Sequence, residues 1–407
     1  MILPITSPSG KAATDVPLCV FDRHLPNRLA IPGALLPLSP IIPRRFPSLR
    51  GEIPSRLGEK SMDPIGLSLM NEIGLSINTR QDTSDEELVS IAKHADDLGY
   101  HSFWAAESWG RDAFTVLTVV ACNTQNIRLA TGIVNVFSRT PALIAQTIAS
   151  LDILSNGRAI LGLGSSGQVV VEGWHGVPFD SPLGRTREYI EIIRKALSGA
   201  PVNHDGKFYQ MERFRMLAPP VQERLPIYIA SLGPKNLELT GEVADGWLPV
   251  WLNQGRIADL KEQLAVGAAK SGRSVSDVTV APYLMCYTSD SPEDLAHGAD
   301  LLRAHIAYYI GGMGTFYFES FSRAGFATEA KAVRDAWGSK NRDQAANAVS
   351  DRMLESVTVL GDVQQCRDQM NKFREAGVDM PVTTFPHGTE IDAIHRTIEA
   401  LAPQAKA

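Results

Sequence analysis

The sequence predicts an α/β fold: a closed (β/α)8 TIM barrel preceded by a disordered N-terminal extension. From Glu72 onward, eight short apolar runs alternate with longer amphipathic stretches, which is typical of parallel strands joined by helices. No dinucleotide-binding glycine fingerprint follows the first run, although an open doubly wound sheet usually carries one there. The length of 407 residues fits two domains or one barrel plus an extension equally well.

Capping residues and apolar runs predict where each helix and strand begins and ends. Ser84 and Glu87 form a capping box that begins the first helix, and Gly99 ends it. The expected strands are 73–77, 102–106, 127–134, 159–163, 226–230, 246–250, 278–287 and 381–385. The expected helices are 85–98, 114–122, 141–154, 185–197, 235–244, 256–270, 328–355, 364–375 and 391–401, with a hairpin around residues 205–206 and an aromatic, glycine-interrupted segment over 299–326.

The first residues have a different composition. Ten prolines lie between Pro4 and Pro54, a density that is incompatible with a regular helix or a central strand. We therefore expect a disordered extension over residues 1–65 and a barrel domain over residues 72–404. Met62 and Met70 are alternative start positions, and the intact mass of the native protein tests that hypothesis.

Composition excludes several classes of function. The net charge is −6, so the chain has no excess of basic residues and nucleic acid is not an expected partner. No apolar run is long and uninterrupted enough to span a bilayer, and no export signal is present, so we expect a cytoplasmic protein without a membrane partner. The four cysteines are too scattered for a disulfide framework or a zinc site, and no metal site is expected.

Glycines and serines follow the central strand in the segment 158–167. Gly162, Gly164 and Gly167 allow a sharp turn and a close approach of the backbone to a ligand, and Ser165 and Ser166 add hydroxyl groups. Such a loop can bind a phosphate through its N–H groups. A tight strand-to-helix turn without a ligand explains the glycines equally well, and the segment is not a P-loop.

Other candidate residues follow strands whose carboxyl ends form the active face of a barrel. Glu107 is followed by Trp109 and Arg111, so it is either a functional carboxylate beside an aromatic ring or the partner of Arg111 in an ion pair. Residues 132–135 leave the third strand in an apolar turn, which either presses against a flat ring or is simply the place where the strand runs into a loop. His175 follows the glycine loop and is either structural or a proton donor.

Several of these segments occur together in one known family. The residues that carry the resemblance are 103–112, 127–134, 139–142, 151–158 with the glycine loop, and 244–247. From residue 72 to residue 401 the chain resembles the bacterial luciferase-like flavin-dependent oxidoreductases. Within them it is most similar to the branch that contains the coenzyme F420-dependent methylenetetrahydromethanopterin reductases.

The resemblance implies a barrel with an insertion after strand seven that binds a flavin or deazaflavin at its mouth. It implies a non-prolyl cis peptide at Gly132–Ile133 behind the ring and a phosphate pocket from the loops after strands four and five. The cofactor-binding residues would then be Gly132, Ile133, Asn135, Ser165, Ser166, Gly167, Ser231, Leu232 and Gly233.

The acidic residue after strand two is Glu107, and Ser108 stands where many relatives have a histidine. The predicted catalytic residues are Glu107, as a hydrogen-bond partner, and His175 and Trp109 bordering the substrate.

The predicted function is hydride transfer between coenzyme F420 and a small-molecule substrate, in a homodimer. The alternative is an FMN-dependent monooxygenase that uses O2, and a third possibility is a non-catalytic flavin-binding relative.

Overall fold

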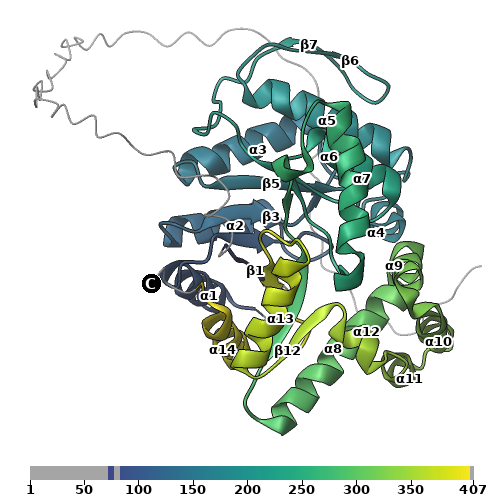
Figure 1. Ribbon diagram of the computed structural model, residues 1–407. Coiled ribbons are helices and arrows are strands. Elements are labelled where there is room, and N and C mark those ends of the chain that lie inside the picture. Colours follow the sequence, from purple (N-terminus) through teal and green to yellow (C-terminus); the bar gives the residue numbers. More distant parts are fainter. Residues whose placement is uncertain (1–71, 78–82, 404–407) are drawn as a thin grey trace, which may run out of the picture. The chain divides into compact units, whose positions relative to one another are not determined.

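The structure of the protein is a computed structural model that describes residues 72–77 and 83–403 (Figure 1). The predicted disordered extension over residues 1–65 lies outside these residues. So does residue 404, the predicted end of the barrel domain.

Eight parallel strands form the barrel at the predicted places. They are β1 (Gly74–Ile77), β2 (Ser102–Ala105), β3 (Arg128–Thr131), β5 (Ala159–Gly164), β8 (Ile227–Ala230), β9 (Gly246–Trp247), β10 with β11 (Thr279–Val280 and Tyr283–Thr288) and β13 (Val382–Thr384). Each pairs with the next along the chain, and β13 pairs with β1. Pro282 interrupts the seventh strand, but Ala281 N–H and Tyr283 N–H still donate to the carbonyls of Trp247 and Pro249. The strands therefore form a closed ring, which confirms the predicted barrel.

The predicted third strand over 127–134 is broken in the structure. β3 ends at Thr131, and after Gly132 and Ile133 the chain forms the two-residue strand β4 (Val134–Asn135), which pairs with β5. The break places a bulge at the carboxyl end of the barrel.

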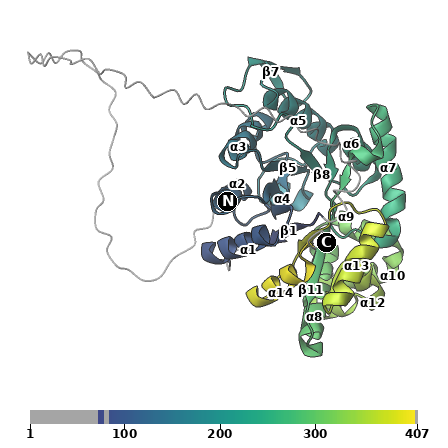
Figure 2. The same ribbon diagram turned by 60° about the vertical axis from the view of Figure 1, so that its left-hand side comes forward.

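The outer helices follow the predicted pattern (Figure 2). They are α1 (Asp85–Asp97), α2 (Ala113–Asn123), α3 (Pro141–Leu154), α5 (Pro182–Leu197), α6 (Pro234–Val243), α7 (Ile257–Lys270), α13 (Val363–Glu375) and α14 (Ile391–Leu401). The capping box of α1 is present: Glu87 N–H donates to Ser84 Oγ over 3.1 Å, and Ser84 N–H donates to Glu87 Oε2 over 2.8 Å. The short helix α4 (Gln168–Gly173) was not expected, whereas the hairpin of β6 (Val202–Asp205) and β7 (Gln210–Phe214) was.

The insertion after the seventh strand is helical. It contains α8 (Pro292–Gly312), α9 (Thr315–Phe321), a π-type turn (Ser322–Phe326), α10 (Ala327–Gly338), α11 (Arg342–Asn347), α12 (Asp351–Glu355) and the unexpected strand β12 (Thr358–Gly361). Short 3₁₀ turns cover Gln254–Arg256 and Val275–Asp277. Gly311, near the end of α8, packs under Trp337, and a Cβ at this position would approach the indole to 2.3 Å.

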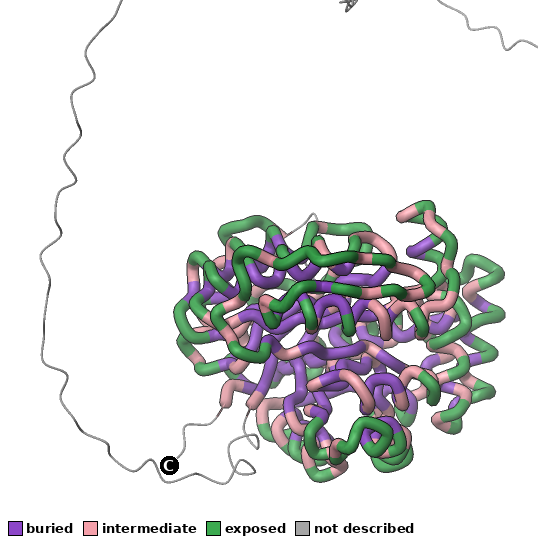
Figure 3. Tube along the Cα trace, turned by 90° about the horizontal axis from the view of Figure 1, so that it is seen from above, coloured by how far each residue is buried: buried purple, intermediate pink, exposed green. Residues whose placement is uncertain are grey.

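Side chains fill the barrel interior. Trp104, Ala130, Ile160, Tyr228, Leu248, Ala281, Met380 and Val382 form a buried cluster there. Figure 3 shows buried segments in the middle of the domain and exposed segments around them. Because the interior is occupied, a ligand can bind only beyond the strand ends.

Candidate active site

One large cavity, of about 560 Å³, opens at the carboxyl ends of the strands. Nine of the twelve predicted site residues line it, and they come from the loops after β2, β3, β5 and β8. They are Glu107, Gly132, Ile133, Ser165, Ser166, Gly167, Ser231, Leu232 and Gly233. Four segments far apart in the sequence therefore meet around one space, at the position where barrel enzymes carry their active sites.

The bulge after β3 forms part of the cavity wall. The Gly132–Ile133 peptide bond is cis, as the resemblance implies. The hydroxyl of Tyr283, on the opposite side of the barrel, donates to the Gly132 carbonyl over 3.0 Å. A Cβ on Gly132 would lie 1.7 Å from that hydroxyl oxygen, so only glycine leaves room for the contact.

Gly162, Gly164 and Gly167 differ in what surrounds them. A Cβ on Gly162 would lie 1.9 Å from the Thr131 carbonyl oxygen, and one on Gly164 would lie 3.1 Å from Ile133 Cδ1. These two glycines make room for β3 and its bulge rather than for a ligand. Of the three, only Gly167 has open space where its Cβ would be, and it lines the cavity with Ser165 and Ser166.

A second corner of the cavity lies at the amino end of α6. Gly233 is the N-cap of this helix, and Lys235 and Asn236 in the first turn also line the cavity. The Ser231 hydroxyl is within 2.8 Å of the Thr240 hydroxyl, so it is engaged in the fold. Sequence reasoning missed Lys235 and Asn236. The available signal was a cation and an amide directly after a Ser-Leu-Gly-Pro turn.

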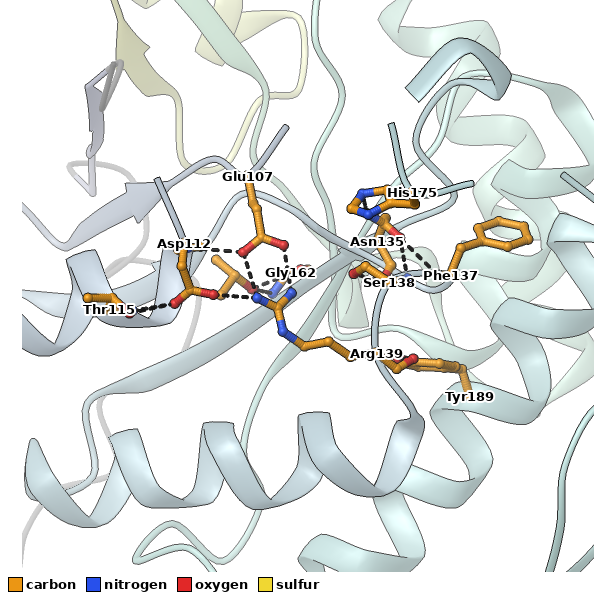
Figure 4. A network of polar contacts seen from close by, with 12 residues as sticks. Glu107, Asp112, Thr115, Asn135, Phe137, Ser138, Arg139, Gly162, His175 and Tyr189 are labelled. Atoms are coloured by element: carbon orange, nitrogen blue, oxygen red, sulfur yellow. Dashed lines mark hydrogen bonds and ion pairs between the residues drawn. The ribbon is translucent and has the colours of Figure 1, made fainter. Parts of the chain in front are cut away.

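The carboxylate of Glu107 binds Arg139, which lies far from it in the sequence (Figure 4). Arg139 Nη1 lies 2.6 Å from Glu107 Oε1, and Arg139 Nη2 lies 2.9 Å from Oε2. Arg111, the partner that the sequence offered, pairs with Asp85 instead, over 2.6 Å. A bidentate pair of this kind fixes the orientation of the carboxylate group.

Three predicted residues do not line the cavity. Trp109 is 49% exposed to solvent. His175 Nε2 lies 3.1 Å from the Asn135 side-chain amide, and Asn135 Oδ1 accepts hydrogen bonds from Phe137 N–H and Ser138 N–H (Figure 4). Asn135 and His175 thus stabilise the turn behind the bulge.

Much of the remaining wall is apolar. It includes Phe179, Pro182, Leu183, Leu248, Tyr283, Tyr309, Met313, Phe316 and Tyr317, and Ser108 and Thr186 add polar groups. Burial raises the pKa of Tyr309 to about 12, so its phenol stays neutral at physiological pH. α8, α9 and the turn between them supply four of these side chains, Tyr309, Met313, Phe316 and Tyr317. The sequence marks this segment only as aromatic and interrupted by glycines.

Within residues 72–77 and 83–403, no group of three potential metal ligands is close enough to hold an ion. None of the helices in this same part of the chain is long and apolar enough to cross a membrane.

A closed β/α barrel with a bulge after strand three and a cavity built from these loops is the geometry that the resemblance implied. The family model of luciferase-like monooxygenases matches residues 64–380, and the chain belongs to this family. It is therefore an enzyme of the luciferase-like oxidoreductases, as the resemblance implied.

Individual relatives agree with this membership. A Mycobacterium tuberculosis protein assigned as a coenzyme F420-dependent oxidoreductase is 32% identical over 331 residues, which are 77% of this chain and 94% of that protein. The 5,10-methylenetetrahydromethanopterin reductase of Methanolobus tindarius is 33% identical over 308 residues, 74% of this chain and 91% of the reductase. The solved F420-dependent tetrahydromethanopterin reductase of Methanopyrus kandleri superposes with a TM-score of 0.71 at 26% identity, covering 81% of this chain and 98% of that one.

Proposed function

We propose that this chain transfers a hydride between coenzyme F420 and a small organic substrate. The observation that carries the proposal is the convergence of the bulge at Gly132–Ile133, the segment 165–167 and the segment 231–233 on one cavity. The similarity to F420-dependent relatives at 32% and 33% identity supports the choice of cofactor.

The residues of the cavity fit a flat ring that carries a phosphate. Ile133 and the aromatic wall offer apolar surface to a ring, and the bulge is fixed by Tyr283. The N–H groups at the start of α6 and the Lys235 ammonium favour an anion. Asn236 Oδ1 is buried without a hydrogen-bond partner among the described residues, so a ligand hydroxyl or N–H group can satisfy it.

When bound, the deazaflavin supplies the hydride, and the protein supplies position and a dry environment. The Tyr309 and Tyr317 wall on the insertion excludes water from the mouth, and Glu107 offers an acceptor to a donor group there. His175 and Trp109 remain predicted substrate neighbours, and Asn135 remains a predicted cofactor residue. None of the three lines the cavity.

Titration of the purified protein with F420 and with FMN tests this proposal. We expect F420 to quench tryptophan fluorescence at the lower concentration. Preferential FMN binding with oxygen-dependent NADH consumption would replace the proposal by the monooxygenase alternative. Binding of either cofactor without turnover on any carbonyl or unsaturated substrate would favour the non-catalytic relative.

We also propose a homodimer that forms through α2 and α3. The sequence of α2 contains no charged residue, and the one charged residue of α3, Asp152, is buried. Leu143, Ile153 and Leu154 on α3 are nevertheless about half exposed, at 47%, 46% and 52%. An exposed helical surface with large apolar residues and no charge is typical of an interface.

Light scattering after gel filtration tests the dimer. Leu154→Glu should shift the wild-type dimer towards monomer, because it places a charge in the proposed contact. Val266→Glu on α7 is the matched control, since Val266 is 49% exposed and lies on another helix. A monomeric wild-type protein, or a dimer that tolerates Leu154→Glu, would contradict the proposal.

The proposed location is the cytoplasm. Cys122, Cys286 and Cys366 are unpaired, which suits a reducing compartment. Fractionation of the native cell, followed by detection of the protein in each fraction, tests this location.

A further inference from the structure

Arg139 lies between β4 and α3 and joins several parts of the barrel mouth. Its guanidinium contacts both oxygens of Glu107 and one oxygen of Asp112, the N-cap of α2. It also lies over the ring of Phe114, 5.4 Å from the ring centroid. The buried Tyr189 on α5 donates its hydroxyl to the Arg139 carbonyl over 2.6 Å. Arg139 is thus fixed from both its backbone and its side chain.

The hydrogen bonds to Glu107 leave little acceptor capacity unused. A carboxylate oxygen has two acceptor positions. Oε2 receives Arg139 Nη2–H and, over 3.1 Å, the N–H of Ala113, so both of its positions are taken. Oε1 receives only Arg139 Nη1–H and keeps one position. The Glu107 side chain is 10% exposed and lines the cavity, so a bound group can use that position.

We infer that Arg139 is a positioning residue: it fixes the Glu107 carboxyl group so that one acceptor position on Oε1 stays available to an N–H or O–H donor in the cavity. Glu107 then acts as a hydrogen-bond acceptor. The inference rests on the proposed function of this cavity, because the donor belongs to the bound cofactor or substrate. The planar fork of arginine is needed, since lysine cannot bind both oxygens in fixed geometry.

The surroundings of Arg139 agree with this role. The hydrogen bond that Arg139 donates to Glu107 is the largest of the causes that raise the pKa of Arg139, so the cation persists at any working pH. Burial raises the pKa of Asp112, but hydrogen bonds from Thr115 and the charge of Arg139 outweigh it and leave that pKa below its usual value. The ionisable groups that face the guanidinium are Glu107 and Asp112. Tyr189 faces the Arg139 backbone carbonyl.

A double-mutant cycle distinguishes positioning from a general structural role. The dissociation constant of F420, or of FMN if that is what binds, is measured by fluorescence for the wild type, Arg139→Gln, Glu107→Gln and the double variant. If Arg139 acts through Glu107, Arg139→Gln should weaken binding by about tenfold in the wild-type background and by less than about twofold in the Glu107→Gln background.

Two single variants serve as matched comparisons. Arg139→Lys keeps the charge but not the planar guanidinium group, so it should bind the cofactor several-fold more weakly than the wild type. Arg111→Gln removes an arginine that is closer to Glu107 in sequence but pairs with Asp85, and it should behave like the wild type. Unchanged binding in Arg139→Gln, or an equal loss from Arg139→Gln in both backgrounds of the cycle, would overturn the inference.

The apoprotein separates this inference from the proposed function. If the wild type binds neither F420 nor FMN, the proposed function fails, and the interaction between Arg139 and Glu107 is measured by unfolding in urea. Arg139→Gln leaves the carboxyl group of Glu107 without its partner, so it should lower the urea midpoint more in the wild-type background than in the Glu107→Gln background. An equal loss in both backgrounds would refute the interaction.

Discussion

The substitution Gly162→Ala tests whether the glycines after the central strand serve strand packing. The new Cβ would lie 1.9 Å from the Thr131 carbonyl oxygen, whereas carbon and oxygen atoms normally approach to about 3.3 Å. The two backbones must therefore separate by more than ~1 Å, and overpacking of this kind costs about 1–3 kcal/mol. The Thr131 hydroxyl also exchanges two hydrogen bonds of 2.8 Å with Gly162, each contributing about 1 kcal/mol.

We therefore expect Gly162→Ala to lower the free energy of unfolding by about 3–5 kcal/mol, measured by urea denaturation. Gly167→Ala is the matched control in the same run of glycines. Its Cβ would meet no atom within 4 Å and its φ of −94° suits alanine, so its cost should stay below about 1 kcal/mol. A Gly162→Ala protein within about 0.5 kcal/mol of the wild type would refute the packing argument.

Three further predictions concern the bulge, the acid response and the anion corner. Tyr283→Phe removes the hydrogen bond to the Gly132 carbonyl, so the variant should lose about 1 kcal/mol of stability and bind F420 more weakly. If urea denaturation and fluorescence titration both match the wild type, the hydroxyl does not hold the bulge. The pKa of His101 is lowered from 6.5 to about 4, and burial is the largest cause. As the pH drops from 6.5 to 4, the unfolded state therefore takes up the proton first, and the free energy of unfolding of the wild type falls by up to about 3 kcal/mol. His101→Gln should flatten the unfolding free energy over that pH range, and an unaltered slope would exclude this histidine as the cause. Lys235→Gln should weaken F420 binding by about tenfold at low salt and less at high salt, whereas Lys270→Gln, which affects an ion pair on the outside of the barrel, should leave F420 titrations unchanged.

The sequence predicted correctly those helices and strands whose signal lies within a few neighbouring residues. The capping box of Ser84 and Glu87 is complete within four residues, and the structure contains it. The short apolar strands separated by helices also have their signal in the chain itself, because each must be buried on both faces of a parallel sheet. β12 was missed for the opposite reason: its four residues form a strand only because they pair with the far end of β11.

The candidate site shows the same limit. Sequence proximity offered Arg111 as the partner of Glu107, but Arg139, 32 residues away, binds both carboxylate oxygens. The fold brings the loops after β2 and β4 together, and the chain between them gives no sign of it. Trp109 follows Glu107 closely in sequence, yet its side chain is half exposed and does not line the cavity.

The sequence by itself determined the eight strands, the helices around them and the loops that end at the barrel mouth, because burial and capping act over a few residues. Only the tertiary structure decided which side chains share the cavity and which charges pair. It also decided that Gly162 serves β3 while Gly167 faces the open cavity. These outcomes depend on distances between residues far apart in the chain, which are fixed only when the barrel closes.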